Sequence, residues 1–394
     1  MSIIDLKTRV VNTDVKVFAL HSGNYKQFNS VFRTSGRIFL DIPGVTFERG
    51  QVSNDPQLKA KVARARRMTQ WYRARERGPL PPQELAHYQN TRMGSSLSAA
   101  VGNVKRLYEE ARVGDIILVP GDGLFSDVLM GEIIEDPPAG EDRIQLEVYQ
   151  EDTIPYRRVS WKAFPLRANL STDLSRSLSR PLAITNIEVP KLINEVLQFV
   201  YGNYIIGNSA KHYFSGESYQ DQPYAPVHGL TLLSALISAV NADRLGDAQL
   251  VRDLDIYRMA SHGLAGVDVV SFQTNFASPG GYRLWANSPT LVLVVAALVA
   301  ATSGCFTYDE AMAASVVNSA AAADASCMIP IQDAYRGAME LLGADKFNEL
   351  VCVNQDAQQN VGLTSGVDVV QNPNYVDVST AAGTSTPAVE RGTR

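Results

Sequence analysis

Cysteine is scarce in this sequence. Only Cys305, Cys327 and Cys352 occur among its 394 residues. Three cysteines late in the chain exclude a disulfide framework and a zinc site built from several thiolates, and they are typical of a reducing compartment. Residues 1–10 also contain no apolar stretch of the kind found in signal peptides. Together these absences predict a cytoplasmic protein.

Long apolar runs are lacking too. The most apolar segment, residues 290–302, is 13 residues long, and no Lys or Arg follows it until Arg336. A membrane-spanning helix needs about 20 consecutive apolar residues with basic residues at its ends. The segment therefore favours a helix buried in a protein core over a membrane span, and we expect no membrane partner.

Signatures of common catalytic sites are missing as well. The five histidines show no metal-binding spacing such as H-x-H or H-E-x-x-H, and the chain has neither a G-x-S-x-G elbow nor a Walker loop. We therefore predict no metal and no cofactor, and the sequence favours a protein without catalytic activity of its own. One enzymatic alternative stays open, a site in the polar and aromatic segment 211–219 assisted by His228 and His262.

The net charge of −5 is the sum of two unlike halves. Residues 1–180 contain 26 Lys and Arg against 21 Asp and Glu, a net charge of +5. Residues 181–394 contain 10 against 20, a net charge of −10. This asymmetry is typical of one half that faces a polyanion and another that faces solvent or a protein partner.

The densest positive segment is residues 59–77, which holds eight cations and a single acid, Glu76. Helical periodicity distributes these cations around the helix rather than along one stripe. Both a solvated helix surface and a phosphate-contacting helix fit this pattern, because cations supply sequence-independent affinity for nucleic acid. The candidates for phosphate contacts are Lys59, Lys61, Arg64, Arg66, Arg67, Arg73 and Arg75.

Short apolar segments separated by Gly and Pro dominate the first half and predict strands. These segments are residues 15–20, 37–42, 116–119, 128–134, 144–148 and 157–161. Helical patterns cover residues 51–77 and 95–112. Consecutive short strands with a helical insertion are typical of a small β-barrel. We therefore predict a β-barrel domain over residues 1–165.

The second half is richer in alanine. The Ser-, Arg- and Leu-rich segment 166–185 predicts a linker. Residues 186–370 predict a mainly helical domain, with residues 207–226 as a loop. From residue 371 the polar composition predicts a disordered tail. The fold class predicted for the whole chain is α+β.

An ordered set of motifs runs through the first half. After the strands 15–20 and 38–42 come Val101-Gly102-Asn103, Gly114-Asp115, Gly131-Glu132 and Tyr156-Arg157-Arg158-Val159-Ser160-Trp161. This order resembles the N-terminal domain of Mrr-type restriction proteins, which has an EVE/PUA-like fold. The resemblance covers residues 15–165, and the C-terminal half is not part of it.

The resemblance implies binding of nucleic acid, with DNA as the expected partner, and inspection of a modified or flipped base in restriction or phage defence. A flipped base needs an aromatic or apolar slot. The candidates are Phe18, Trp71, Tyr72 and Trp161, all residue types that a protein core also accommodates. Arg157 and Arg158 are further candidates for phosphate contacts, although strand alternation turns only one of them outward.

Mrr-type proteins usually continue into a magnesium-dependent nuclease, which needs an acid on one strand and an E/Q-x-K motif on the next. Asp268 and Gln273 are present without that lysine, so we expect no nuclease in the second half. Two hypotheses follow. The chain is a nucleic-acid-binding sensor or specificity protein, or it is an assembly subunit of a phage or defence complex. In both, the acidic second half holds a protein partner or self-associates.

Overall fold

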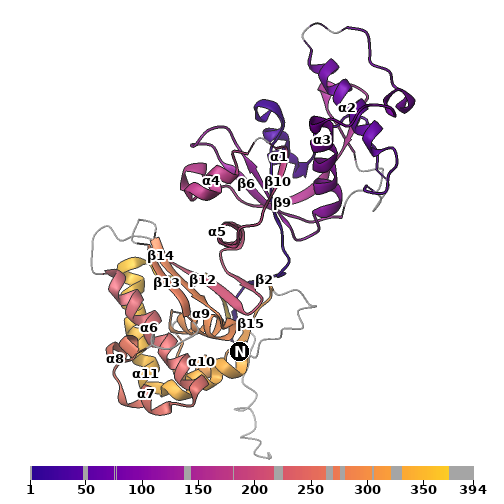
Figure 1. Cartoon of the computed structure of the whole chain (residues 1–394). Helices are drawn as coiled ribbons and strands as arrows, with labels where there is room; N and C mark the ends of the chain where they lie inside the picture. The colour runs from indigo at the N-terminus through magenta and orange to yellow at the C-terminus, as the bar shows by residue number, and fades with distance from the viewer. Residues whose placement is uncertain are drawn as a thin grey trace, which may run out of the picture. The chain divides into compact units, whose positions relative to one another are not determined.

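The computed structural model describes residues 2–47, 52–74, 76, 78–136, 143–180, 182–216, 225–262, 269–275, 280–303, 306–320 and 331–371. The chain divides into two compact units (Figure 1). The inserted unit is Val11–Gly207, and the flanking unit combines Met1–Val10 with Asn208–Arg394. Both contain helices and strands, so the predicted α+β class is confirmed.

A six-stranded sheet organises the inserted unit. Its order is β10 (Ile184–Ile187), β3 (Val17–Leu20), β5 (Ile116–Pro120), β6 (Val128–Ile133), β9 (Arg157–Ala163) and β4 (Arg37–Ile38). β3 and β5 are parallel, and the other neighbours are antiparallel. The sheet curls into a half-barrel. β5 and β6 are buried at every residue, which agrees with the apolar run of β5 and the mostly apolar sequence of β6 that predicted them.

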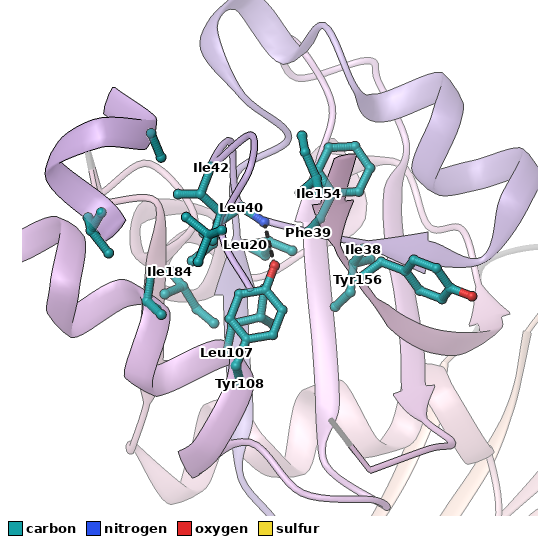
Figure 2. Packing of buried hydrophobic residues seen from close by; sticks show 14 of the residues in the cluster. Leu20, Ile38, Phe39, Leu40, Ile42, Leu107, Tyr108, Ile154, Tyr156 and Ile184 are labelled. Carbon is teal, nitrogen blue, oxygen red and sulfur yellow. Dashed lines mark hydrogen bonds between the residues drawn. The ribbon is translucent and has the colours of Figure 1, made fainter. Parts of the chain in front are cut away.

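Each face of this sheet carries its own hydrophobic core, because successive side chains of a strand point to opposite faces. The first core takes Phe18 and Ile117 and is covered by α1 (Asn29–Ser35), α2 (Leu58–Arg73) and α3 (Ser95–Lys105). Figure 2 shows part of it, including the Tyr108 hydroxyl that accepts a hydrogen bond from the Leu40 amide at 3.3 Å. The second core takes the alternate residues Val17 and Ile116 and is covered by α4 (Thr172–Ser177) and α5 (Pro190–Tyr201).

Short elements complete the inserted unit. They are the pair β7 (Arg143–Gln145) and β8 (Thr153–Pro155), β11 (Tyr204–Ile206), and the single-turn helices η1 (Asn24–Lys26), η2 (Leu85–Tyr88), η3 (Arg106–Glu110), η4 (Glu147–Tyr149) and η5 (Arg167–Asn169). In the sequence, β2 (Arg9–Val11) spans the boundary between the two units.

The linker predicted over residues 166–185 is wrong, because this segment folds within the inserted unit. It contains η5, α4 and the start of β10, and β10 pairs with β3. Leu170, Leu174 and Leu178 recur every four residues and are all buried in the second core. Ser171 caps α4 by accepting a hydrogen bond from the Leu174 amide at 3.2 Å. The prediction relied on the Ser- and Arg-rich composition and overlooked the helical spacing of these leucines.

The flanking unit contains helices, as predicted for the second half, and also strands that the prediction did not include. Its helices are α6 (Ala225–Leu245), α7 (Ala248–Asp253), α8 (Ile256–His262), α9 (Pro289–Ser303), α10 (Tyr308–Met312) and α11 (Ile331–Val361). Its strands are β12 (Ser209–Gly216), β13 (Val269–Asn275) and β14 (Gly280–Ala286) in one sheet, and β1 (Ser2–Asp5), β15 (Ser315–Val317) and β16 (Asp368–Gln371) in another.

β12 occupies a segment predicted as loop, and its composition explains the error. Alternate residues are buried, but they are Ala210, His212, Phe214 and Gly216, a mixture without the β-branched residues that mark strands. Pairing with β14 over seven residues stabilises it instead. The tail predicted as disordered lies outside the described residues except for Gln371, which ends β16.

α9 confirms the prediction of a core helix for residues 290–302. Every residue from Leu291 to Thr302 is buried. No helix within the described residues is long and apolar enough to cross a membrane.

Candidate functional site

One end of the six-stranded sheet gathers four connecting segments. β3, β5 and β9 run in the same direction and finish at this end, whereas β6 and β10 begin there. The segments are residues 21–28, 121–127, 164–171 and 178–183. The carboxyl ends of parallel strands are a common place for ligand sites, because loops from several strands converge there. We call this region the carboxyl end of the sheet.

A cavity of about 390 Å³ opens at the carboxyl end, a volume in the range of small-molecule sites. Its wall includes His21, Tyr25, Lys26, Asp41, Ser179 and Arg180. Residues far apart in the sequence thus form one surface, which carries the His21 imidazole, the Tyr25 ring and the Ser179 hydroxyl.

The segment after β3 holds an unusual backbone conformation at the cavity. Tyr25 and Lys26 have positive φ values of 52° and 56°, a region that side chains other than glycine enter at a cost. Gly23, just before this turn, also has a positive φ of 78°, which glycine adopts without strain. The Tyr25 side chain is fully exposed, 101% of its reference area. Strain of this kind persists only where surrounding structure imposes it, and it concentrates at functional sites.

His21 is held as a neutral donor and acceptor. Lys26 Nζ lies 2.5 Å from His21 Nδ1, and His21 Nε2 lies 2.7 Å from the carbonyl oxygen of Arg180. The lysine donates to Nδ1, so the proton of the imidazole is on Nε2 and is donated to the carbonyl. Burial, followed by the charge of Lys26, lowers the pKa of His21. Burial, followed by the charge of Arg167, lowers the pKa of Lys26.

Three cations at the carboxyl end form no ion pair with any of the described acids. Among the described residues, no carboxylate lies within ion-pair distance of Lys26, Arg167 or Arg180. Arg167 is fixed by serines, with Nη2 donating to the Ser175 carbonyl at 2.8 Å and to the Ser179 hydroxyl. The charges of these cations are therefore available to an anionic ligand.

The cations of α2 are mostly engaged inside the protein. Lys61 pairs with Asp55 at 2.6 Å, Arg64 lies 3.6 Å from Asp152, and Arg73 pairs with Asp41. α2 packs its apolar face into the first core, which brings its cations against these acids.

Other α2 candidates lie differently. Arg66 donates to the Ser96 hydroxyl at 2.6 Å, Lys59 is half-buried and Arg67 is exposed. Arg75 lies outside the described residues. Lys61 and Arg64 also line a polar cavity of about 330 Å³ that includes Asp152. Two acids, Glu151 and Asp152, line this second cavity, whereas the first is lined by one acid, Asp41, which pairs with Arg73. The second cavity is therefore the weaker anion site.

Arg157 does not contact solvent, so its prediction as a phosphate ligand is wrong. β9 alternates, placing Arg157 inside and Arg158 outside, as strand periodicity predicted for the pair. The buried guanidinium donates to the carbonyls of Leu107 and Ala111, each at 2.9 Å, and of Glu135 at 2.8 Å. It caps the carbonyl end of the α3–η3 helix. Arg158 forms an ion pair with Glu135 at 3.2 Å.

The four predicted base-slot aromatics belong to the first core instead. Phe18 and Tyr72 are buried in it, and Trp71 and Trp161 pack against it. Both indoles are used internally, donating to the carbonyls of Gly78 and Phe32, each at 2.8 Å. None of the four lines either cavity described above. Large aromatic side chains lie in the core because burying their large apolar area stabilises the fold most.

Sequence reasoning missed the residues that do meet at the carboxyl end, among them Tyr25, Lys26, Arg167 and Arg180. The available signal was the Ser22-Gly23-Asn24 turn directly after a predicted strand, a common place for functional residues. The cations themselves are scattered through the sequence without local density.

Within the described residues, no group of His, Cys, Asp and Glu could hold a metal ion. Comparisons with protein-family models, with curated proteins and with solved structures find no match for the chain.

Proposed function

We propose that this chain binds nucleic acid at the carboxyl end of the sheet and receives a single base in the cavity beside His21. In this proposal the inserted unit is an EVE/PUA-like domain of a cytoplasmic sensor or specificity protein, and the ligand is DNA that carries a modified or flipped base in a restriction or phage-defence setting.

The observation that carries the proposal is an exposed aromatic ring beside cations that form no ion pair with a described acid. Tyr25 is fully exposed and held by strained backbone, while Lys26, Arg167 and Arg180 have no acid partner within the described structure. Aromatic rings stack on bases and cations neutralise phosphates, and surfaces that bind unpaired nucleotides combine the two.

The cavity supplies polar groups that could read the edge of a base. The His21 ring, the Lys26 ammonium and the Ser179 hydroxyl lie on its wall, so donors and an acceptor are both present. Its volume of about 390 Å³ exceeds what one base requires and leaves room for a substituent.

The test is equilibrium binding of the full chain to a fluorescent single strand and to the matching duplex, from about 50 to about 300 mM salt. We expect affinity to fall steeply with salt. Lys26→Gln and Arg180→Gln should each reduce the slope of log K against log salt by about 0.7–0.9, the value for one lost phosphate contact. Tyr25→Ala should weaken binding by about 1–3 kcal/mol.

The control distinguishes the two basic surfaces. Arg67→Gln removes an exposed cation of α2 and should leave the slope unchanged. A slope that changes with Arg67 and not with Lys26 or Arg180 would transfer the interface to α2. Absence of binding even at about 50 mM salt would reject the proposal in favour of an assembly subunit.

A further inference from the structure

The loop 121–127, between β5 and β6, exposes two large apolar side chains at the carboxyl end. Phe125 is 86% exposed and Leu124 is 58% exposed. Burial of apolar side chains stabilises a protein in proportion to the area removed from water, so leaving both exposed forgoes that stabilisation.

Hydrogen bonds fix this loop in place. The Gly121 amide donates to the Asp127 carbonyl at 3.0 Å, and the Ser126 hydroxyl donates to the Gly123 carbonyl at 2.9 Å. The amides of Arg167 and Ala168 donate to the carbonyls of Ser126 and Leu124, at 3.0 and 2.9 Å. The two apolar side chains are therefore presented by a braced loop.

The same bracing connects the loop to the cavity. Arg167 holds Ser126 through its backbone amide and Ser179, a residue of the cavity wall, through its guanidinium. Burial lowers the pKa of Lys26, whereas the negative charge of Asp122, which lies at the start of the loop, raises it. Next to the loop, Arg33 pairs with Asp127 and lies 5.1 Å from the centre of the Phe164 ring.

We propose that Phe125 is a wedge that enters the base stack of duplex DNA and takes the space left by the base that moves into the cavity. This inference rests on the proposed function and adds the form of the ligand, a duplex opened at one nucleotide. Moving a base out of a duplex costs a few kcal/mol of stacking and pairing. Apolar side chains inserted between base steps offset such costs, provided they are held rigidly.

The experiment uses the full chain and a duplex with one 2-aminopurine, whose fluorescence rises when the base leaves the stack. The wild-type chain should raise the fluorescence several-fold on binding. Phe125→Ala should abolish the rise and weaken duplex binding about tenfold, while affinity for the single strand changes less than about twofold. Phe125→Leu should restore part of the rise, because a branched apolar side chain also fits between base steps.

A matched control is Tyr257→Ala, which removes an exposed aromatic side chain of the flanking unit and should change neither readout. Duplex binding by the wild type without a rise would overturn the wedge and leave the proposed function standing. So would an unchanged rise in Phe125→Ala, or an equal loss of affinity for both ligands. If the wild type binds neither ligand at about 50 mM salt, both proposals fail.

Discussion

At the scale of single residues, burial decides what a charged side chain does. Arg157 and Arg158 are neighbours of identical chemistry, yet one is fully buried and the other pairs with Glu135 at the surface. Burial lowers the pKa of Arg157 to about 10, still above neutral pH, so the protein holds a buried cation. Three carbonyl oxygens compensate for its lost hydration.

Arg157→Ala should therefore destabilise the protein by about 3–5 kcal/mol, because it leaves a cavity and three carbonyls without a donor. Arg158→Ala removes only a surface ion pair and should cost less than about 1 kcal/mol. Urea unfolding followed by circular dichroism measures both values. Equal effects of the two variants would contradict the assigned role of Arg157.

Because His212 is buried, we expect the free energy of unfolding to depend on pH. Burial lowers its pKa to about 4, and its Nε2 donates to the Ser365 carbonyl at 2.6 Å. In the unfolded chain the pKa is about 6.5, so below that pH the unfolded state binds the proton first. The free energy of unfolding should fall by up to about 3 kcal/mol as pH drops from about 6.5 to about 4.

The measurement is urea unfolding at pH values between about 4 and about 7.5. His212→Gln keeps an amide donor and removes the titration, so it should flatten this part of the profile. His87→Gln, which replaces an exposed histidine, is the control substitution. The sequence left open an enzymatic site in residues 211–219. His212 is buried on β12, so its side chain is not exposed to a substrate at such a site.

At the scale of elements, the turn after β3 departs from local preference. A left-handed backbone costs a side chain other than glycine about 1–2 kcal/mol, and here two such residues follow each other. Asn24–Lys26 is a single turn of helix with no buried residue, so its own packing does not explain the conformation. Bonds from His21 to Lys26 and to the Arg180 backbone hold the turn from outside.

Tyr25→Gly should relieve the strain and raise the free energy of unfolding by about 0.5–1 kcal/mol. The same variant should weaken nucleic-acid binding, since the stacking ring is gone. Gln27→Gly is the control, because Gln27 has an ordinary φ of −56° and glycine there adds only unfolded-state freedom. Thermal unfolding measures the expected gain in stability, and the binding titration measures the expected loss of affinity. A Tyr25→Gly protein less stable than the wild type would argue against strain.

At the scale of the whole molecule, one unit is inserted into the sequence of the other. β1 comes from the first residues of the chain, yet it lies between β15, in parallel, and β16, antiparallel. Ile4 is buried, whereas its neighbour Ile3 is partly exposed. The flanking unit is therefore assembled from two segments separated by the whole inserted unit.

Ile4→Asp should unfold the flanking unit, because it buries an unpaired carboxylate. The inserted unit should stay folded, since it has its own sheet and its own two cores. Hydrogen exchange read by peptide mass spectrometry resolves the two units. Ile3→Asp, one residue away, should leave both protected. Loss of protection in the inserted unit as well would show that the units do not fold independently.

The sequence was sufficient where a short stretch of chain carries its own physical signal. The strand β5 was predicted from a continuous apolar run, β6 from a short, mostly apolar segment, and α2 from the helical pattern of residues 51–77. α9 was recognised as a core helix because its length rules out a membrane span. Such signals depend only on residues within one or two turns of each other.

Tertiary structure decided everything that depends on distant partners. β1 and β12 are stabilised by strands that lie far away in the sequence, and the cations of the carboxyl end come from segments that only the fold brings together. The density of cations in α2 is visible in the sequence and predicted an interface there. Asp41 and Asp152, which pair with Arg73 and Arg64, are distant in the sequence and come close only on folding. Sequence sets which charges exist, and only the fold sets which of them meet an opposite charge.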